Sequence, residues 1–310
     1  MNNKSVEIRN EVKKVIVGKD DVIDKVMMAI LSGGHILLED VPGVGKTTLA
    51  LAFSKALGIK YKRVQFTPDS VPSDITGFTM YDKENGRFKY IQGAAMTNLL
   101  LADEINRTSG RTQSALLEVM EEGNVTVDGQ SYSVPQPFVV IATQNPSGWR
   151  GTQPLPNAQL DRFMIRLEMG YPEKTALIDL LKDRHNTNPM AEIRSVVSEN
   201  ELIAMKREAE QVFISDEIYE YISQLVEASR NHEMIQLGVS PRGALALCRM
   251  AKAKAYVSGR NYVIPEDISF VFTDVLSHRI ILEAKAKLSE VTEKKVLEEI
   301  IEKVGIPNIG

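Results

Sequence analysis

The hydrophobic pattern divides the chain into two parts. In the first part, short apolar runs alternate with longer segments that carry apolar residues at helical spacing. Continuous apolar runs such as Leu99–Ala102 suit strands that are buried on both faces of a parallel sheet. Strands that alternate with helices are typical of α/β proteins, so a five-stranded parallel sheet is predicted here. Its predicted strands are Ile36–Leu38, Tyr61–Phe66, Leu99–Ala102, Phe138–Ala142 and Phe163–Leu167.

The second part begins near Pro172, where the strand signals stop and apolar residues recur at helical spacing. We therefore expect an α/β core over residues 1–170 and a smaller all-helical domain over residues 171–310. The helices predicted for this second domain are Thr175–His185, Glu199–Gln211, Asp216–Asn231, Pro241–Gly259, Pro265–Ile280 and Thr292–Gly305.

Two dipeptides in the first part predict β-hairpins. Asn85-Gly86 and Asp128-Gly129 each lie between residues that alternate in polarity, and both dipeptides favour tight hairpin turns. The first hairpin is inserted away from the predicted chemistry, which suggests a protruding element.

The segment from His35 to Ala50 has the pattern of a phosphate-binding loop. A strand enters a glycine-containing loop, and a helix follows at once. Glycines let the backbone turn tightly and direct its N–H groups at phosphate oxygens. Lys46 is expected at the β- and γ-phosphates and Thr47 at Mg²⁺, whereas the alternative is a glycine-rich turn before an ordinary helix. The residues predicted to contact the nucleotide here are Val41, Pro42, Gly43, Val44, Gly45, Lys46, Thr47 and Thr48.

Asp40 departs from the usual loop pattern, which has glycine at this position. An aspartate tolerates left-handed backbone angles at some cost, but its carboxylate would repel a phosphate that it faced. The direction of this carboxylate is therefore an open question.

Polar residues follow two of the predicted buried strands. Asp103 and Glu104 end the strand Leu99–Ala102, and Asn145 follows Phe138–Ala142. Ligands of open α/β sheets bind at the carboxyl ends of the strands, so Asp103 is predicted to hold Mg²⁺ and Glu104 to act as general base. Asn145 is placed to orient a water beside the γ-phosphate. The alternatives are a solvated acidic pair and an asparagine that caps a loop.

Two arginines are candidates for contacts with the transferred phosphoryl group. Arg162 precedes the last predicted strand and suits an arginine finger, although Asp161 beside it allows a simple ion pair. Ser240 and Pro241 are good N-cap and first-turn residues, so they place Arg242 on the first turn of a helix. From there Arg242 would reach back toward the nucleotide, or would be a solvated arginine.

Composition narrows the class of protein. The chain has 310 residues, a net charge of -4 and a single cysteine, Cys248. The acidic balance gives no broad attraction to nucleic acid, and a lone cysteine is typical of a reducing compartment. The sequence shows no signal peptide and no apolar run long enough for a membrane span. A cytoplasmic protein is expected.

Seven segments together resemble the MoxR family of AAA+ ATPases, in order and across nearly the whole chain. They are DVPGVGKT, FTPDSVPSDITG, LLLADEINR, TQSALLEVMEE, ATQNP, LPNAQLDRF and SPRGALAL. The resemblance implies an AAA+ core followed by a helical lid, with ATP and Mg²⁺ as ligands. It also implies a homo-oligomeric ring, expected to be a hexamer, in which both hairpins point toward the pore.

The same resemblance implies a role for each site residue. Lys46 and Thr47 would belong to Walker A, Asp103 and Glu104 to Walker B, and Asn145 would be sensor 1. Arg162 would be the finger donated to a neighbouring subunit, and Arg242 would be sensor 2, acting on its own subunit's nucleotide. Val17 and Gly18 resemble the family's adenine-side turn; without the phosphate loop they would be a turn between helices.

The function that the resemblance implies is a chaperone-like remodelling ATPase. Its clients would be protein complexes that it matures or loads with metal, with a von Willebrand factor A domain protein as partner. One alternative is an AAA+ motor on nucleic acid, against which the acidic balance argues. The other is a nucleotide-controlled scaffold with little turnover, against which Glu104 and both arginines argue.

Overall fold

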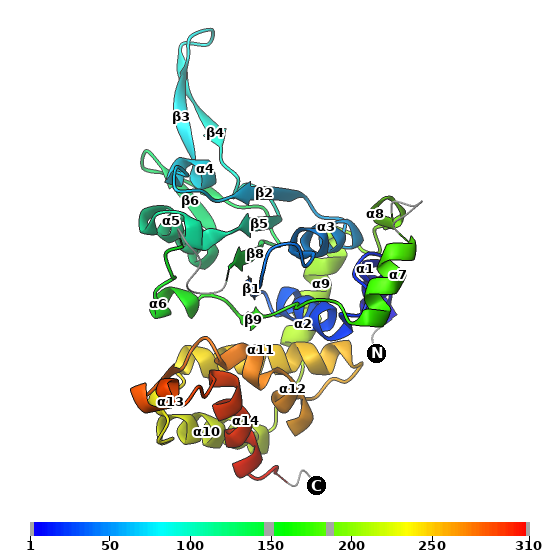
Figure 1. The fold of residues 1–310 in the computed structure, drawn as a ribbon. Coiled ribbons are helices and arrows are strands. Elements are labelled where there is room, and N and C mark those ends of the chain that lie inside the picture. The colour runs from blue at the N-terminus through cyan, green and yellow to red at the C-terminus, as the bar shows by residue number, and fades with distance from the viewer. Residues whose placement is uncertain (1–2, 146–151, 184–188, 308–310) are drawn as a thin grey trace.

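A five-stranded parallel sheet forms the centre of the computed structural model, which describes residues 3–145, 152–183 and 189–307 (Figure 1). The strand order is β2-β5-β8-β1-β9, and every neighbouring pair is parallel. The predicted sheet is therefore confirmed. The bounds of its strands are β1 (Ile36–Glu39), β2 (Tyr61–Gln65), β5 (Leu99–Asp103), β8 (Val139–Gln144) and β9 (Ile165–Leu167).

The register of the sheet brings the carboxyl ends of four strands to one edge. Gln65 is opposite Asp103, and Glu39 is opposite Gln144. Residues that directly follow β1, β5 and β8 therefore lie near one another. This is the arrangement expected if a ligand binds at the carboxyl ends of the strands.

Alternating side chains of the strands pack on opposite faces of the sheet. Leu37 and Leu100 pack on one face with residues of α5 (Gly110–Glu122), such as Leu116. Ile36 and Leu101 pack on the other face, in a cluster that also contains residues of three helices. These helices are α1 (Asn3–Lys13), α2 (Asp20–Leu31) and α3 (Lys46–Ala56).

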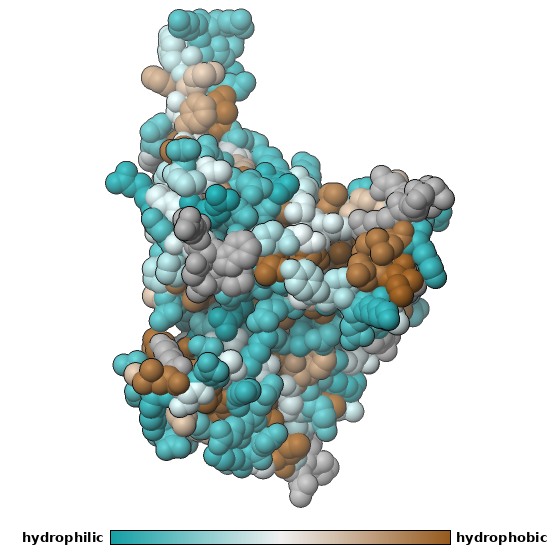
Figure 2. All heavy atoms as spheres, viewed as in Figure 1, coloured by the Kyte–Doolittle hydropathy of each residue, from teal (hydrophilic) through white to brown (hydrophobic). Residues whose placement is uncertain are grey.

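Both predicted hairpins are present. The short helix α4 (Pro72–Thr76) leads into β3 (Gly77–Asp82) and β4 (Arg87–Gln92), and this hairpin projects from the sheet (Figure 1). Its large apolar side chains Phe78, Met80, Tyr81 and Phe88 are exposed, and brown and tan spheres mark the hairpin in Figure 2. The second hairpin consists of β6 (Asn124–Val127) and β7 (Gln130–Ser133).

The second part of the chain is mainly helical, but not entirely so. A short antiparallel pair, β10 (Ile235–Leu237) and β11 (Ile281–Leu282), joins segments that are far apart in the sequence. Strands of two or three residues are too short to show a period, so the pattern predicted helices alone. The helices are α7 (Lys174–Asp183), α8 (Pro189–Glu192), α9 (Glu199–Glu210), α10 (Asp216–Arg230), α11 (Pro241–Val257), α12 (Pro265–Leu276), α13 (Ala284–Leu288) and α14 (Glu293–Lys303).

The two parts share one hydrophobic cluster. Helices α9 and α11 pack against α2, and α12 packs against β9. The backbone N–H of Val196, after α8, donates to the carbonyl of Ala56 at the end of α3. The chain therefore first runs back along the α/β part before α10 to α14 form a separate layer (Figure 1). The boundary at residue 170 stays a prediction.

Within the described parts of the chain, none of the helices combines the length and the apolar character that a membrane span requires.

Candidate functional site

The phosphate loop connects β1 to α3. Gly43 and Gly45 have φ angles of +88° and +100°, which glycine adopts without steric penalty. A Cβ at Gly43 would have no heavy atom within 4 Å, so this stretch of backbone is open to a ligand. Lys46 begins α3, and its ammonium group donates to the carbonyl oxygen of Asp40 over 2.7 Å. Burial lowers the pKa of Lys46, whereas the charges of Asp40, Asp103 and Glu104 oppose that shift.

The Asp40 carboxylate points toward the segment after β9. One of its oxygens accepts hydrogen bonds from the backbone N–H groups of Met169, over 2.5 Å, and Gly170, over 2.8 Å. The other oxygen accepts from the N–H of Val41 over 3.1 Å. Asp40 does not adopt a positive φ angle, so glycine is not required there. The carboxylate thus accepts charge-assisted hydrogen bonds from backbone N–H groups, two of which belong to residues far along the chain.

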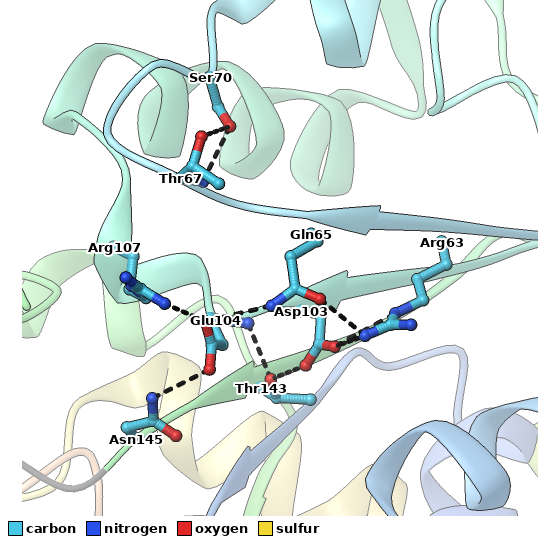
Figure 3. A network of polar contacts seen from close by, with 9 residues as sticks. All are labelled: Arg63, Gln65, Thr67, Ser70, Asp103, Glu104, Arg107, Thr143 and Asn145. Carbon is cyan, nitrogen blue, oxygen red and sulfur yellow. Dashed lines mark hydrogen bonds and ion pairs between the residues drawn. The ribbon is translucent and has the colours of Figure 1, made fainter. Parts of the chain in front are cut away.

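Asp103 and Glu104 are held by residues of the neighbouring strands (Figure 3). The Thr143 hydroxyl donates to one Asp103 oxygen over 2.6 Å, and it accepts the N–H of Glu104 over 2.8 Å. Arg63, on β2, donates to the other Asp103 oxygen over 2.5 Å and 3.2 Å. Glu104 has left-handed backbone angles, φ 57° and ψ 47°, which are unusual for a residue other than glycine.

Three side chains donate hydrogen bonds to the Glu104 carboxylate (Figure 3). They are Asn145 at 3.2 Å, Gln65 at 3.2 Å and Arg107 at 2.9 Å. Partial burial raises the pKa of Glu104, but these hydrogen bonds and the charge of Arg107 outweigh it, so the pKa lies below its usual value. Glu104 is therefore ionised at neutral pH, as a general base must be.

Two adjoining hollows share the phosphate loop. The polar hollow has a volume of about 360 Å³. Its lining residues are Pro42, Gly43, Gly45, Lys46, Thr47, Thr48, Arg63, Gln65, Asp103, Glu104 and Asn145. Hydroxyl and carboxylate oxygens are ligands that Mg²⁺ prefers, so Thr47 and Asp103 fit a magnesium site in this hollow.

The second hollow, of about 340 Å³, is largely apolar. Val17 lines it together with Ile16, Val44 and Leu177, and it shares Gly43, Gly45 and Thr48 with the polar hollow. Gly18 packs closely against α7, because a Cβ there would lie 2.7 Å from the Cβ of Ala176. Exposed apolar residues of α7, among them Leu181, form a brown patch in Figure 2. A polar hollow next to an apolar one suits a ligand with phosphates and a planar base.

Arg162 and Arg242 meet at a residue that the sequence did not single out. Glu121, in the last turn of α5, accepts a hydrogen bond from Arg162 Nε over 2.8 Å, and its other oxygen lies 3.3 Å from Arg242 Nη2. Among the described residues that line the two hollows, neither arginine occurs. The start of α11, which carries Arg242, therefore lies beside α5 and Arg162, and the roles expected for the two arginines stay predictions.

Sequence reasoning missed several polar partners in the site. Gln65 ends β2 at the same edge as Asp103, so the edge argument that selected Asp103 would also have found it. Arg63 lies inside the predicted strand Tyr61–Phe66, where no local signal marks it, whereas Thr143 directly follows the predicted strand Phe138–Ala142 and could have been found in the same way as Gln65. The role of Glu121 depends on two helices and a loop meeting, which no motif describes.

Comparison with known proteins agrees with the fold described above. A family model described as ATPases associated with various cellular activities (AAA) matches residues 35–165, and an AAA lid domain model matches residues 227–300. YeaC of Bacillus subtilis strain 168 is 46% identical, over 96% of this chain and 92% of its own length. A crystal structure from Cytophaga hutchinsonii, 39% identical, has a TM-score of 0.89 and covers 98% of this chain and 97% of its own.

A further relative carries a family name. Chaperone MoxR1 of Mycobacterium tuberculosis is 38% identical, over 97% of this chain and 81% of its own length. The similarity spans both the α/β part and the helical part. The chain therefore belongs to the MoxR family of AAA+ ATPases.

Proposed function

We propose that this protein binds ATP with Mg²⁺, hydrolyses it, and uses the hydrolysis to remodel client protein complexes. The observation that supports the proposal best is the polar hollow at the carboxyl edge of the sheet. Lys46, Thr47, Asp103, Glu104 and Asn145 all line it, although they come from three separate segments of the chain.

Each of these residues has a chemical part in the proposed reaction. The Lys46 ammonium exchanges the Asp40 carbonyl for phosphate oxygens, while the N–H groups around Gly43 and Gly45 hold the phosphates. Thr47 and Asp103 would hold Mg²⁺, which when bound would neutralise phosphate charge. Glu104 accepts a proton from the attacking water, and Asn145, hydrogen-bonded to Glu104, helps to orient that water.

The reaction also needs positive charge at the γ-phosphate, which we propose comes from a neighbouring subunit. Arg162 and Arg242 lie together at Glu121 and not at the hollow of their own chain. In a homo-oligomeric ring, expected to be a hexamer, both would reach the neighbour's ATP. Phosphate oxygens would then take the place of the Glu121 carboxylate as their anionic partner.

The cellular role is proposed from the family. MoxR1 of M. tuberculosis is named a chaperone. We infer a role in maturation or metal loading of client protein complexes, together with a von Willebrand factor A domain protein. The projecting β3–β4 hairpin, with its exposed aromatic residues, would face the ring pore and contact the client.

Phosphate release from ATP, measured with purified protein in Mg²⁺ and in EDTA, tests the proposal. We expect Mg²⁺-dependent turnover that saturates with ATP and does not change when DNA is added. Stimulation by DNA that falls steeply with salt would instead indicate a nucleic-acid motor. Tight ATP binding without turnover would indicate the scaffold.

A further inference from the structure

We propose that Arg279 is a positioning residue that holds the finger segment, Asp161–Met164, and couples it to the helical lid. This inference rests on the proposed function, since it assigns a task to the residues around the finger Arg162. Arg279 follows α12 by three residues and therefore belongs to the lid.

Each nitrogen of the Arg279 guanidinium makes at least one hydrogen bond to a backbone or carboxylate oxygen. Nε donates to the Asp161 carboxylate over 2.7 Å, and Nη2 donates to the carbonyls of Phe163, over 2.6 Å, and Asp161, over 3.3 Å. Nη1 donates to the Met164 carbonyl over 3.1 Å and also to the Val275 carbonyl of α12. Arginine has five donors in a planar fork, and here they bind the chain on both sides of Arg162.

Burial makes this contact rigid. The Arg279 side chain is only 2% exposed, and the Asp161 side chain is 22% exposed. The segment is also fixed from its other side, since the N–H of Met164 donates to the carbonyl of His35, ahead of β1. The Arg162 backbone therefore cannot shift unless buried hydrogen bonds break or the lid moves with it.

A second contact links Arg279 to the start of α11. A Cβ at Gly243, on the first turn of α11, would lie 3.0 Å from Cδ of Arg279. Arg242 is the residue before Gly243, and it shares Glu121 with Arg162. The stem of Arg279 thus supports the turn that carries Arg242, while its guanidinium holds the segment that carries Arg162. A change in lid position would move both arginines together.

Stability alone does not require such a buried ion pair. Replacing a buried pair by apolar side chains is often neutral or stabilising, because removing two charges from water is unfavourable. Arg279 binds the backbone carbonyls of Asp161, Phe163 and Met164, on both sides of Arg162, and a positioning role explains this arrangement better than stability does. Misplacement by about 1 Å lowers reaction rates by up to about a hundredfold.

The test compares Arg279→Gln with a matched control in the lid. Arg260 forms a similar pair with buried Asp267, over 2.8 Å and 2.6 Å, and both residues belong to the lid. We expect Arg279→Gln to lower kcat by about ten- to a hundredfold. The KM for ATP and the affinity for ADP should stay within about twofold. Arg260→Gln should lower the melting temperature but leave kcat unchanged.

Rings that contain both Arg279→Gln and Glu104→Gln subunits show whether Arg279→Gln misplaces the finger or damages the ATP site of its own subunit. Glu104→Gln subunits have an intact finger, so they should restore turnover to Arg279→Gln neighbours. Arg279→Lys keeps the charge but not the fork, and it should behave like Arg279→Gln. Asp161→Asn keeps the backbone contacts of Arg279, so it should lower kcat less and show the same rescue. If the Arg279 variants do not fold, this variant tests the positioning role.

Three outcomes would contradict the inference or the proposed function on which it rests. If mixing with Glu104→Gln rescues Arg162→Ala but not the Arg279 or Asp161 variants, the positioning role is wrong and the finger stands. If it does not rescue Arg162→Ala either, the proposed finger in trans is wrong, and the positioning role is lost with it. A raised KM or weakened ADP binding in Arg279→Gln would also contradict positioning.

Discussion

The phosphate-loop hollow and the arginine pair, Arg162 and Arg242, are formed by different kinds of structural element. The hollow is formed by one loop and three neighbouring strand ends, and its main residues lie within one chain. The arginine pair is formed where α5, the segment before β9 and the start of α11 meet, and its anionic partner is Glu121. The difference teaches that one edge of the sheet gathers the residues of the hollow, whereas contacts between the α/β part and the helical part bring the two arginines together.

Replacing Lys46 should abolish ATP binding in the phosphate-loop hollow. Without its ammonium the loop cannot hold the phosphates, so Lys46→Ala should abolish ATP-induced thermal stabilisation. For the unchanged protein this stabilisation is about 2.7 kcal/mol when ATP is at 100 times its Kd. Lys55→Ala, in the last turn of the same helix, is the control and should keep the shift. Unchanged stabilisation in Lys46→Ala would refute the phosphate-loop assignment.

Glu104→Gln should separate binding from chemistry within the same hollow. The amide cannot accept the proton of water, so kcat should fall by about 10²- to 10⁴-fold while ATP binding persists. Because the pKa of Glu104 is lowered, its carboxylate stays ionised as pH falls from 7 toward 5. Turnover should therefore show no loss from this group over that range. Normal turnover of Glu104→Gln would exclude it as the base; the exposed Glu118→Gln on α5 is the control.

Arg242→Ala tests whether the arginine pair acts on the nucleotide of a neighbouring subunit. Since Arg242 lies with Arg162, we expect kcat to fall by about tenfold or more and to recover when Glu104→Gln subunits are mixed in. A loss that mixing cannot repair would mean that Arg242 serves its own subunit's nucleotide. Phosphate release at several mixing ratios provides the measurement.

Asp40→Asn should give the smallest effect. The carboxylate binds the N–H groups of Met169 and Gly170, and the substitution removes its charge and part of this acceptor capacity. We expect the free energy of unfolding in urea to fall by about 1–2 kcal/mol, with ATP affinity changed by less than about threefold. A large gain in ATP affinity would show that the carboxylate repels phosphate after all.

The sequence by itself determined the nucleotide half of the molecule. Glycines in a loop between an apolar run and a helix, followed by acidic residues after the next buried strand, are local patterns with a direct backbone meaning. The alternation of apolar runs predicted the sheet, and parallel strands bring the residues after β1, β5 and β8 to one edge. The resemblance to the MoxR family also rested on segments outside these patterns, such as FTPDSVPSDITG and LPNAQLDRF.

Only the tertiary structure decided how distant segments meet. The Asp40 carboxylate contacts residues 129 and 130 positions further along the chain, and Arg279 contacts Asp161 across 118 positions. Arg242 and Arg162 share Glu121 because the start of α11 lies beside α5, which no sequence pattern indicates. Such contacts leave no period in the sequence, because they depend on how the lid packs on the sheet and not on any local preference of the backbone.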